Sequence, residues 1–266
     1  MLMFGLGQGY FLILGAACGV VGFRLGWRIG NRWGMPLAQG IAGWTAFAYA
    51  WRWGTPGLAA ATVGTWALAT TLVSLYFFVP NAEAVDRRVL RAKEYRREML
   101  AWLRSGAGPE STPFATLRRH LHETLVYVAC ALVTANLASI VLGAVLLNYM
   151  NAYVATLLRA ARRTAVVAML AWNVWSVVRV GAYVALGAAA AAPAAAWLRL
   201  PATEPVGPLA WGAGGALVVD LALKLALSRP CGRLLARAVD LDAADANRRA
   251  EEPRFTLGLG DDEPRA

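Results

Sequence analysis

The sequence predicts an all-α fold, a polytopic bundle of helices in a membrane, and three observations lead to this prediction. Hydrophobic residues make up 58% of the 266 residues, and only 16% are charged. A soluble domain has about 25% charged residues. The charges gather in basic clusters, separated by uncharged runs long enough to cross a bilayer core as helices. We therefore expect about six or seven membrane segments.

Three of these runs occupy residues 1–80, which we interpret as an N-terminal unit of three membrane helices. They cover residues 2–23, 35–51 and 57–79. Pro80 ends the third run, because the residue before a proline disfavours the helical conformation.

Glycines recur at steps of three or four residues along the first run and its continuation. This spacing places Gly15, Gly19, Gly22 and Gly26 on one face of a helix. Because glycine has no side chain, a second helix can approach such a face closely. We predict that these four glycines form a helix-packing surface.

Residues 81–124 form a polar section that contains nine Lys and Arg residues. Residues 83–104 have a partial apolar stripe, so we predict one amphipathic helix that lies on the membrane surface or packs under the bundle. The Gly, Pro and Ser content of residues 106–113 predicts a loop. The positive-inside rule places this basic section in the cytoplasm.

A C-terminal membrane unit is predicted over residues 125–228. It contains the apolar runs 125–158, 164–198 and 206–227. The first of these has 34 uncharged residues, which is too long for one crossing and short for two. Residues 229–266 are polar and mixed in charge, and we predict a disordered cytoplasmic tail.

The distribution of Lys and Arg discriminates between one crossing and two for residues 125–158. A hairpin or re-entrant segment turning near Gly143 puts eighteen basic residues inside, in clusters of three, nine, three and three, against two outside. A single crossing divides them more evenly, so the hairpin is favoured. Asn136, Ser139 and Asn148 would then bond the irregular backbone. This arrangement predicts that the N-terminus lies outside the membrane and the C-terminus inside, and the use of Arg over Lys with many Ala residues favours a bacterial inner membrane.

Three charged residues within the apolar runs are the candidates for chemistry inside the bilayer. Asp220 and Lys224 are four residues apart on one helical face, in the order that favours an ion pair. Arg179 has a similar predicted depth. Such a cluster could form a proton or ion pathway, since intramembrane charges often mark one. It could equally fix one helix in register, or the long basic side chains could extend toward the interface.

Other kinds of chemistry find little support in the sequence. His120, His122 and Glu123 form the only histidine cluster, and a zinc site needs more ligands than this. The cysteines are isolated, and we find neither a nucleotide fingerprint nor a pairing of nucleophile and base. We therefore predict no metal, cofactor, catalytic residue or nucleic-acid partner. The basic residues instead face anionic lipid on the cytoplasmic side.

Three classes of function follow from these observations. A structural or interaction subunit of an inner-membrane assembly, packed against other subunits or a copy of itself, is favoured by the glycine face and the scarcity of intramembrane charge. An ion- or proton-coupled transporter or channel would use Asp220, Lys224 and Arg179. A membrane enzyme has least support. A transporter should present Asp220 to a water-filled cavity, whereas a subunit should bury it against Lys224 or Arg179.

Overall fold

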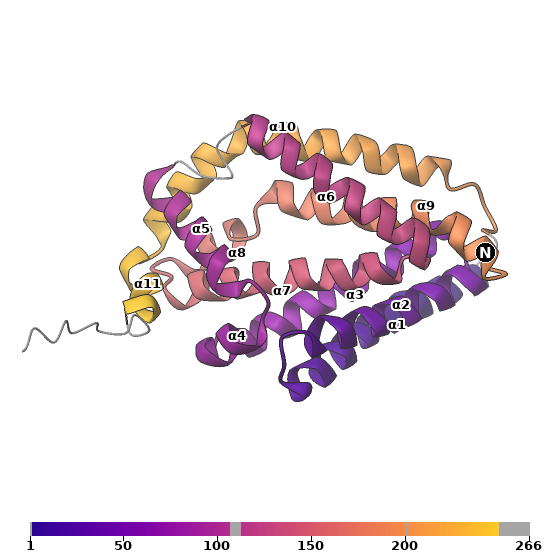
Figure 1. Ribbon diagram of the computed structural model, residues 1–266, viewed down its shortest axis with the longest axis horizontal. Coiled ribbons are helices and arrows are strands. Elements are labelled where there is room, and N and C mark those ends of the chain that lie inside the picture. The colour runs from indigo at the N-terminus through magenta and orange to yellow at the C-terminus, as the bar shows by residue number, and fades with distance from the viewer. Residues whose placement is uncertain (1, 107–112, 201, 250–266) are drawn as a thin grey trace, which may run out of the picture.

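The computed structural model describes residues 2–106, 113–200 and 202–249, and all its named elements are helices (Figure 1). They are α1 (Leu2–Ile29), α2 (Gly34–Trp53), α3 (Pro56–Phe78), α4 (Ala82–Arg88), α5 (Ala92–Ser105), α6 (Pro113–Thr134), α7 (Leu137–Arg159), α8 (Thr164–Leu170), α9 (Val174–Trp197), α10 (Gly207–Ala238) and α11 (Leu241–Arg249). The all-α prediction is confirmed for these ranges.

Long helices run back and forth along the long axis of the molecule, while α4, α5, α8 and α11 gather at one end (Figure 1). Within the described ranges, five segments are long and apolar enough to cross a membrane. They lie in α1, α3, α7, α8–α9 and α10. This architecture fits a multi-pass membrane protein.

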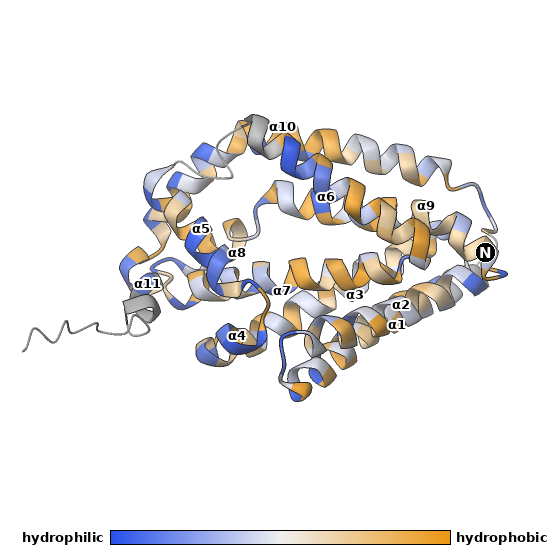
Figure 2. Cartoon of the chain, in the orientation of Figure 1, coloured by the Kyte–Doolittle hydropathy of each residue, from blue (hydrophilic) through white to orange (hydrophobic). Residues whose placement is uncertain are grey.

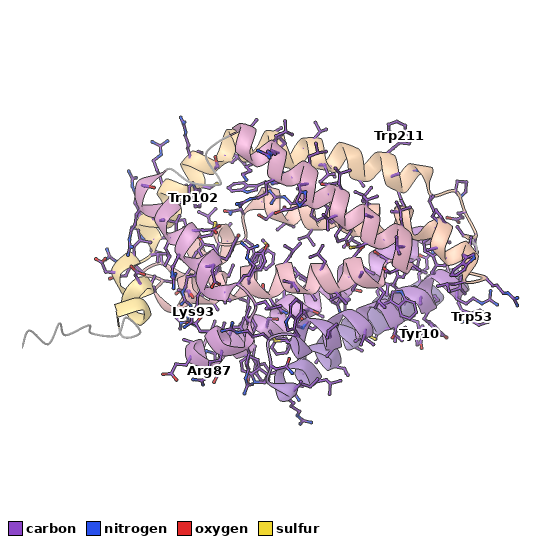
Figure 3. All side chains as sticks on the ribbon, viewed as in Figure 1. Tyr10, Trp53, Arg87, Lys93, Trp102 and Trp211 are labelled. Atoms are coloured by element: carbon purple, nitrogen blue, oxygen red, sulfur yellow. The ribbon has the colours of Figure 1, made fainter. Side chains whose placement is uncertain are left out.

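The two ends of the bundle differ in the side chains that they present. Figure 2 shows hydrophilic residues concentrated in α4, α5, α11 and the first half of α6. Arg87 and Lys93 lie at this end in Figure 3, and Trp53 and Tyr10 lie toward the other. Trp53 and Trp211 are exposed, as tryptophans at a membrane interface would be.

The glycines of α1 lie against the backbones of both neighbouring helices. A Cβ atom added at Gly19 would lie 2.7 Å from the carbonyl oxygen of Trp66 in α3. One added at Gly26 would lie 2.6 Å from the Cα atom of Met35 in α2. Gly15 likewise faces α3, and Gly22 faces α2. The absence of a side chain at these positions therefore sets how closely α1 packs.

Polar bonds tie α2 to the later half of the chain. Gln39 and Asn148 exchange two amide hydrogen bonds of 3.1 and 2.6 Å, and both side chains are buried. Trp44 donates through Nε1 to the carbonyl oxygen of Ala135 over 2.8 Å. Trp51 donates in the same way to the carbonyl oxygen of Leu200.

The predicted single helix over residues 83–104 is wrong, because the chain breaks between α4 and α5. Arg91 adopts a left-handed conformation with φ of 59°. The break lets the guanidinium of Arg96 donate to both carboxylate oxygens of Asp86 over 2.7 and 2.8 Å. On a continuous helix these residues would stand about 15 Å apart along the axis. The apolar side chains of α5, among them Trp102, are buried under the bundle.

The predicted turn near Gly143 is also wrong, since Gly143 lies in the middle of α7. The chain reverses at Ala135 and Asn136, which have φ of 47° and 74°. The reason is that α6 begins at Pro113, so its first half consists of residues predicted as a loop and a cytoplasmic polar section. Residues 113–159 are long enough for two full helices, whereas the apolar run 125–158 by itself was not.

The remaining apolar runs also differ from their predicted bounds. Residues 171–173 separate α8 from α9, and α10 continues past residue 227 and through Pro230 to Ala238. The helix α11 occupies residues predicted as disordered tail, and it contacts α5 and α7. The prediction of disorder for residues 250–266 lies outside the described residues.

Asp240 fixes the start of α11, and its protonation should release this helix. Its carboxylate accepts from the backbone N–H groups of Ala243 and Asp242 and from Arg162 over 3.0 Å. The N–H of Ala243 and then Arg162 hold the pKa of Asp240 below its usual value of 3.8. A lowered pKa means that the carboxylate stabilises α11 above pH 3.8 and that this contribution is lost as the pH falls below that value.

We therefore expect amide hydrogen exchange in α11, corrected for intrinsic rates, to stay constant between about pH 7 and pH 5. It should rise only below the usual pKa of a carboxyl. The Asp240→Ala variant should exchange faster already at neutral pH, because the N-cap acceptor is gone. Equal exchange in this variant and the wild type would show that Asp240 does not hold α11.

Candidate functional site

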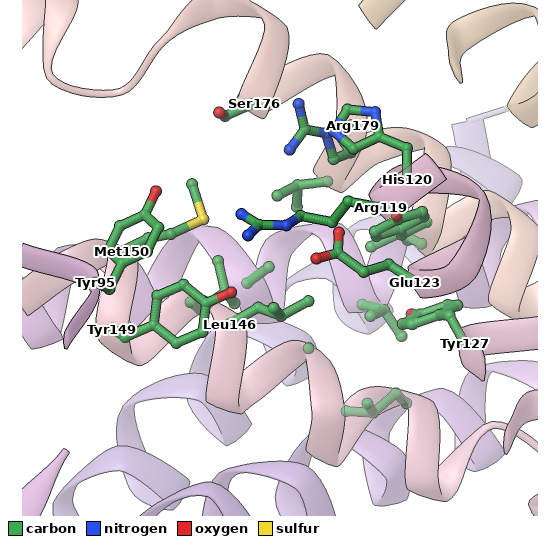
Figure 4. Close-up of a pocket in the computed structure, with 18 of the residues that line it drawn as sticks. Tyr95, Arg119, His120, Glu123, Tyr127, Leu146, Tyr149, Met150, Ser176 and Arg179 are labelled. Carbon is green, nitrogen blue, oxygen red and sulfur yellow. The ribbon is translucent and has the colours of Figure 1, made fainter. Parts of the chain in front are cut away.

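A cavity of about 110 Å³ lies between α6, α7 and α9, with α3 behind it (Figure 4). The walls are fixed by packing: α6 contacts α7 and α9, and α3 contacts the same two helices. Tyr95 of α5 and Lys224 of α10 complete the lining. The cavity thus joins the predicted N-terminal unit, the basic section and the C-terminal unit.

One side of the cavity is polar and charged. This polar side is formed mainly by three residues of α6, namely Arg119, His120 and Glu123. Figure 4 shows Arg119 and Glu123 reaching toward Tyr149 of α7 across the space between the helices. Arg119 is exposed and His120 and Glu123 are half-buried, so this side reaches the protein surface.

The three charged candidates predicted from the sequence come together beside this polar side. Arg179 of α9 donates from Nε and Nη2 to the two carboxylate oxygens of Asp220 over 2.9 and 3.0 Å. Lys224 lies one turn further along α10 and, like Asp220, is buried. The Nδ1 atom of His120 lies 3.6 Å from a carboxylate oxygen of Asp220. Arg179 and Lys224 line the cavity, and Asp220 stands behind Arg179 with no exposed surface.

The bidentate pair between Arg179 and Asp220 fixes the position of one side chain that lines the cavity. A planar guanidinium held at two points by a carboxylate has little freedom to rotate. Asp220 therefore sets the orientation of the Arg179 side chain, and it holds α9 and α10 together at this level. Asp220 does not line the cavity and is buried against Arg179, as we expected for a structural subunit. Arg179 itself does line the cavity.

The residues predicted to satisfy a re-entrant backbone lie elsewhere. Ser139 donates to the carbonyl oxygen of Tyr127 over 2.8 Å and fastens α7 to α6 close to the turn. Asn136 forms the turn and is buried, and a Cβ atom at Gly187 would lie 2.6 Å from its Oδ1 atom. Asn148 pairs with Gln39 between α7 and α2. None of the three is part of the cavity lining.

Aromatic residues form much of the remaining boundary. Tyr127 and Tyr183 stack with ring centroids 5.0 Å apart, and the hydroxyl groups of Tyr183 and Thr124 lie 3.4 Å from each other. Tyr95 and Tyr149 pack with centroids 4.6 Å apart. Tyrosine combines an apolar ring with a polar tip, which suits a boundary between polar and apolar lining.

Sequence reasoning did not assign Arg119, Glu123 or the tyrosines to a site. The signal was nevertheless present, because His120, Glu123 and Tyr127 are three and four residues apart and share one face of α6. The shared face of His120 and Glu123 was considered only for metal binding, because residues 81–124 were assigned to the cytoplasm. In the described ranges, no three His, Cys, Asp or Glu side chains gather closely enough to hold a metal ion.

The arrangement offers cationic groups, the carboxylate of Glu123 and several hydroxyl groups around a largely apolar space. Such a site can bind a ligand through charge-assisted hydrogen bonds and apolar contacts. Compared with protein-family models, with curated proteins and with solved structures, the chain matches none of them.

Proposed function

We propose that this chain is a multi-pass transporter or channel of a bacterial inner membrane, which takes its solute into the cavity between α6, α7 and α9. Asp220 is buried against Arg179, and the observation that carries the proposal is instead that Arg179 and Lys224, on two helices long enough to span a bilayer, face a cavity. An ionisable group within a membrane-spanning helix has a high free-energy cost, and such groups commonly mark a solute pathway.

The proposal includes seven crossings, in which α2 and α6 join the five segments of spanning length and apolarity. Successive long helices then alternate in direction. The four basic clusters, within residues 24–32, 87–119, 159–163 and 229–237, therefore all fall at the end that carries α4, α5, α8 and α11. The positive-inside rule assigns this end to the cytoplasm. The N-terminus is then outside and the C-terminus inside, and anionic lipid surrounds the basic end.

A purely structural subunit is the second candidate, and the burial of Asp220 supports it. A bidentate pair without exposed carboxylate surface acts well as a fixed joint between α9 and α10. The two candidates differ in one property that can be measured. A transporter needs a cavity that water-soluble reagents can enter, and a structural subunit does not.

Thiol labelling at Ser176 tests this difference. Ser176 lines the cavity beside Arg179, and Ser74 in α3 is fully buried outside it. After replacement of Cys18, Cys130 and Cys231 by alanine, the Ser176→Cys variant should react with a membrane-impermeant methanethiosulfonate. We expect a rate about tenfold or more above that of the Ser74→Cys control, because thiol reactivity follows access to water.

The side of access is part of the prediction. Labelling should be fast in inverted vesicles, where the cytoplasmic face is outward, and slow in right-side-out vesicles. Rates as low as those of the Ser74→Cys control in both preparations would rule out a solute cavity and leave the structural subunit. Fast labelling only in right-side-out vesicles would reverse the proposed orientation.

A further inference from the structure

The charges around the cavity do not cancel. Arg119, Arg179 and Lys224 carry three positive charges, while Glu123 and Asp220 carry two negative ones. With His120 neutral, these groups leave one formal positive charge in excess beside a cavity whose lining is largely apolar. Three cationic side chains facing one cavity attract an anion, and the attraction is stronger beside apolar lining than in bulk water.

The opposite part of the lining is apolar. It consists of side chains from α3, α7 and α9, among them Trp66, Ile140 and Val184. Gly143 also lines it, and a Cβ atom added there would meet nothing within 4 Å. This part has the character of a site for hydrocarbon, because it offers no charged group to a ligand.

The polar and apolar parts follow each other along the helix axes. On α9, Ser176 and Arg179 come first and Val184 lies about 8 Å further along at the rise of an α-helix. On α7, Tyr149 lies toward the basic end, and Ile140 lies toward the turn at Ala135. A ligand in this cavity would therefore have its charged group nearer the basic end. Lipids in the leaflet at the basic end are oriented in the same way, with the head group toward that end and the hydrocarbon chain toward the middle of the bilayer.

The polar side of the cavity lies where α6 and α7 are far apart. Helices α6 and α7 meet at their shared turn and diverge toward the basic end (Figure 1). The exposed Arg119 stands on the diverging part of α6. A cavity of about 110 Å³ is somewhat smaller than one of ~150 Å³ that admits benzene. It would hold an acidic group and the first carbons of a chain.

We infer that the cavity binds an amphiphilic anion, a phosphate or carboxylate group on an apolar chain. The acidic group lies among Arg119, Arg179 and Lys224, and the chain extends toward Trp66 and Ile140. This inference rests on the proposed function, since it names the class of solute for the same cavity.

Photo-crosslinking of the full chain in phosphatidylcholine nanodiscs tests the inference. The probe is decanoic acid with a terminal diazirine, and its sites of attachment are mapped by mass spectrometry. We expect attachment to α3, α7 and α9 at the apolar lining. Decanoate and decyl phosphate should compete with the probe about tenfold better than decan-1-ol or inorganic phosphate, because only they offer both the charge and the chain.

Two pairs of variants separate the charged part of the cavity from the apolar part. Arg119→Gln should weaken competition by decanoate about tenfold, and Arg118→Gln, a neighbour outside the lining, should not. Gly143→Leu should fill the apolar part and abolish crosslinking there. Gly64→Leu, at another position with open space, should leave crosslinking unchanged.

The outcomes distinguish this inference from the proposed function. Equal competition by decan-1-ol and decanoate, or unchanged crosslinking in Gly143→Leu, would overturn the amphiphilic anion. Competition by inorganic phosphate as strong as that by decyl phosphate would replace it with a small anion. If Ser176→Cys still reacts rapidly while no probe attaches to the cavity, the solute class is wrong and the cavity remains the site. If phosphatidylglycerol in the nanodisc reduces attachment, a membrane lipid supplies the anion, and otherwise a free fatty anion does.

Discussion

Replacing Asp220 with asparagine should lower the free energy of unfolding by about 3 kcal/mol, because it leaves buried positive charge without its counter-ion. Asp220 has no exposed surface and accepts two bonds from Arg179. Lys224 is buried one turn away. Asparagine has nearly the same shape, so the loss reports the charge rather than a cavity. Unfolding by sodium dodecyl sulfate in mixed micelles, followed by near-UV circular dichroism, measures the change.

Glu83→Gln is the matched control for Asp220→Asn. Glu83 also pairs with an arginine, at 3.6 Å from Arg87, but both side chains are largely exposed. An exposed pair of this kind contributes about 0–1 kcal/mol. An Asp220→Asn variant no less stable than the control would mean that water enters and compensates Arg179. The double variant with Arg179→Gln should recover part of the loss, as expected for two groups that act as one pair.

Replacing Gly19 with alanine should destabilise the protein by about 1–3 kcal/mol, because the added methyl group has no room. Its Cβ atom would lie 2.7 Å from a backbone oxygen of Trp66 and 3.0 Å from the Cβ atom of Ala69. Neither group is the end of a flexible side chain. Helix α1 must therefore move away from α3, and contacts along the whole interface are lost. Thermal unfolding in mild detergent measures the effect.

Gly64→Ala provides the opposite result on the helix that Gly19 faces. A Cβ atom at Gly64 would meet nothing within 4 Å. There alanine should leave the stability unchanged or raise it by up to about 1 kcal/mol, because it favours the helical backbone more than glycine does. If both substitutions had the same sign and size, helix propensity rather than close packing would govern the glycines of α1.

The sequence was sufficient to predict the helical class, because uncharged runs of spanning length need no tertiary information to be recognised. It also placed Asp220, Lys224 and Arg179 as candidates for one cluster. The structure pairs Arg179 with Asp220 between α9 and α10, and Lys224 lines the same cavity as Arg179. What periodicity could not provide was the identity of the partner helix, since α6 supplies His120 from another part of the chain.

The boundaries were predicted less well, and for one physical reason. Hydropathy marks where a helix becomes unfavourable to lipid, and not where its hydrogen-bonded backbone ends. α6 therefore begins with polar residues from Pro113, and α10 extends through Pro230 into a basic stretch. The break at Arg91 is a tertiary effect, since it lets Asp86 meet Arg96. The cavity was missed because half of its charged lining lies in the polar turns of α6.

The bonds of α2 to the later helices bear on the order in which the protein matures. During synthesis Gln39 enters the membrane well before Asn148 exists, because 109 residues separate them. Trp44 and Trp51 likewise donate to carbonyl oxygens that are synthesised 91 and 149 residues later. Until then these side chains lack the partners that they have in the complete chain, and a polar group left unbonded within a bilayer is costly. A chain that ends after α3 would therefore leave the Gln39 amide without Asn148, whereas the complete chain buries and bonds it.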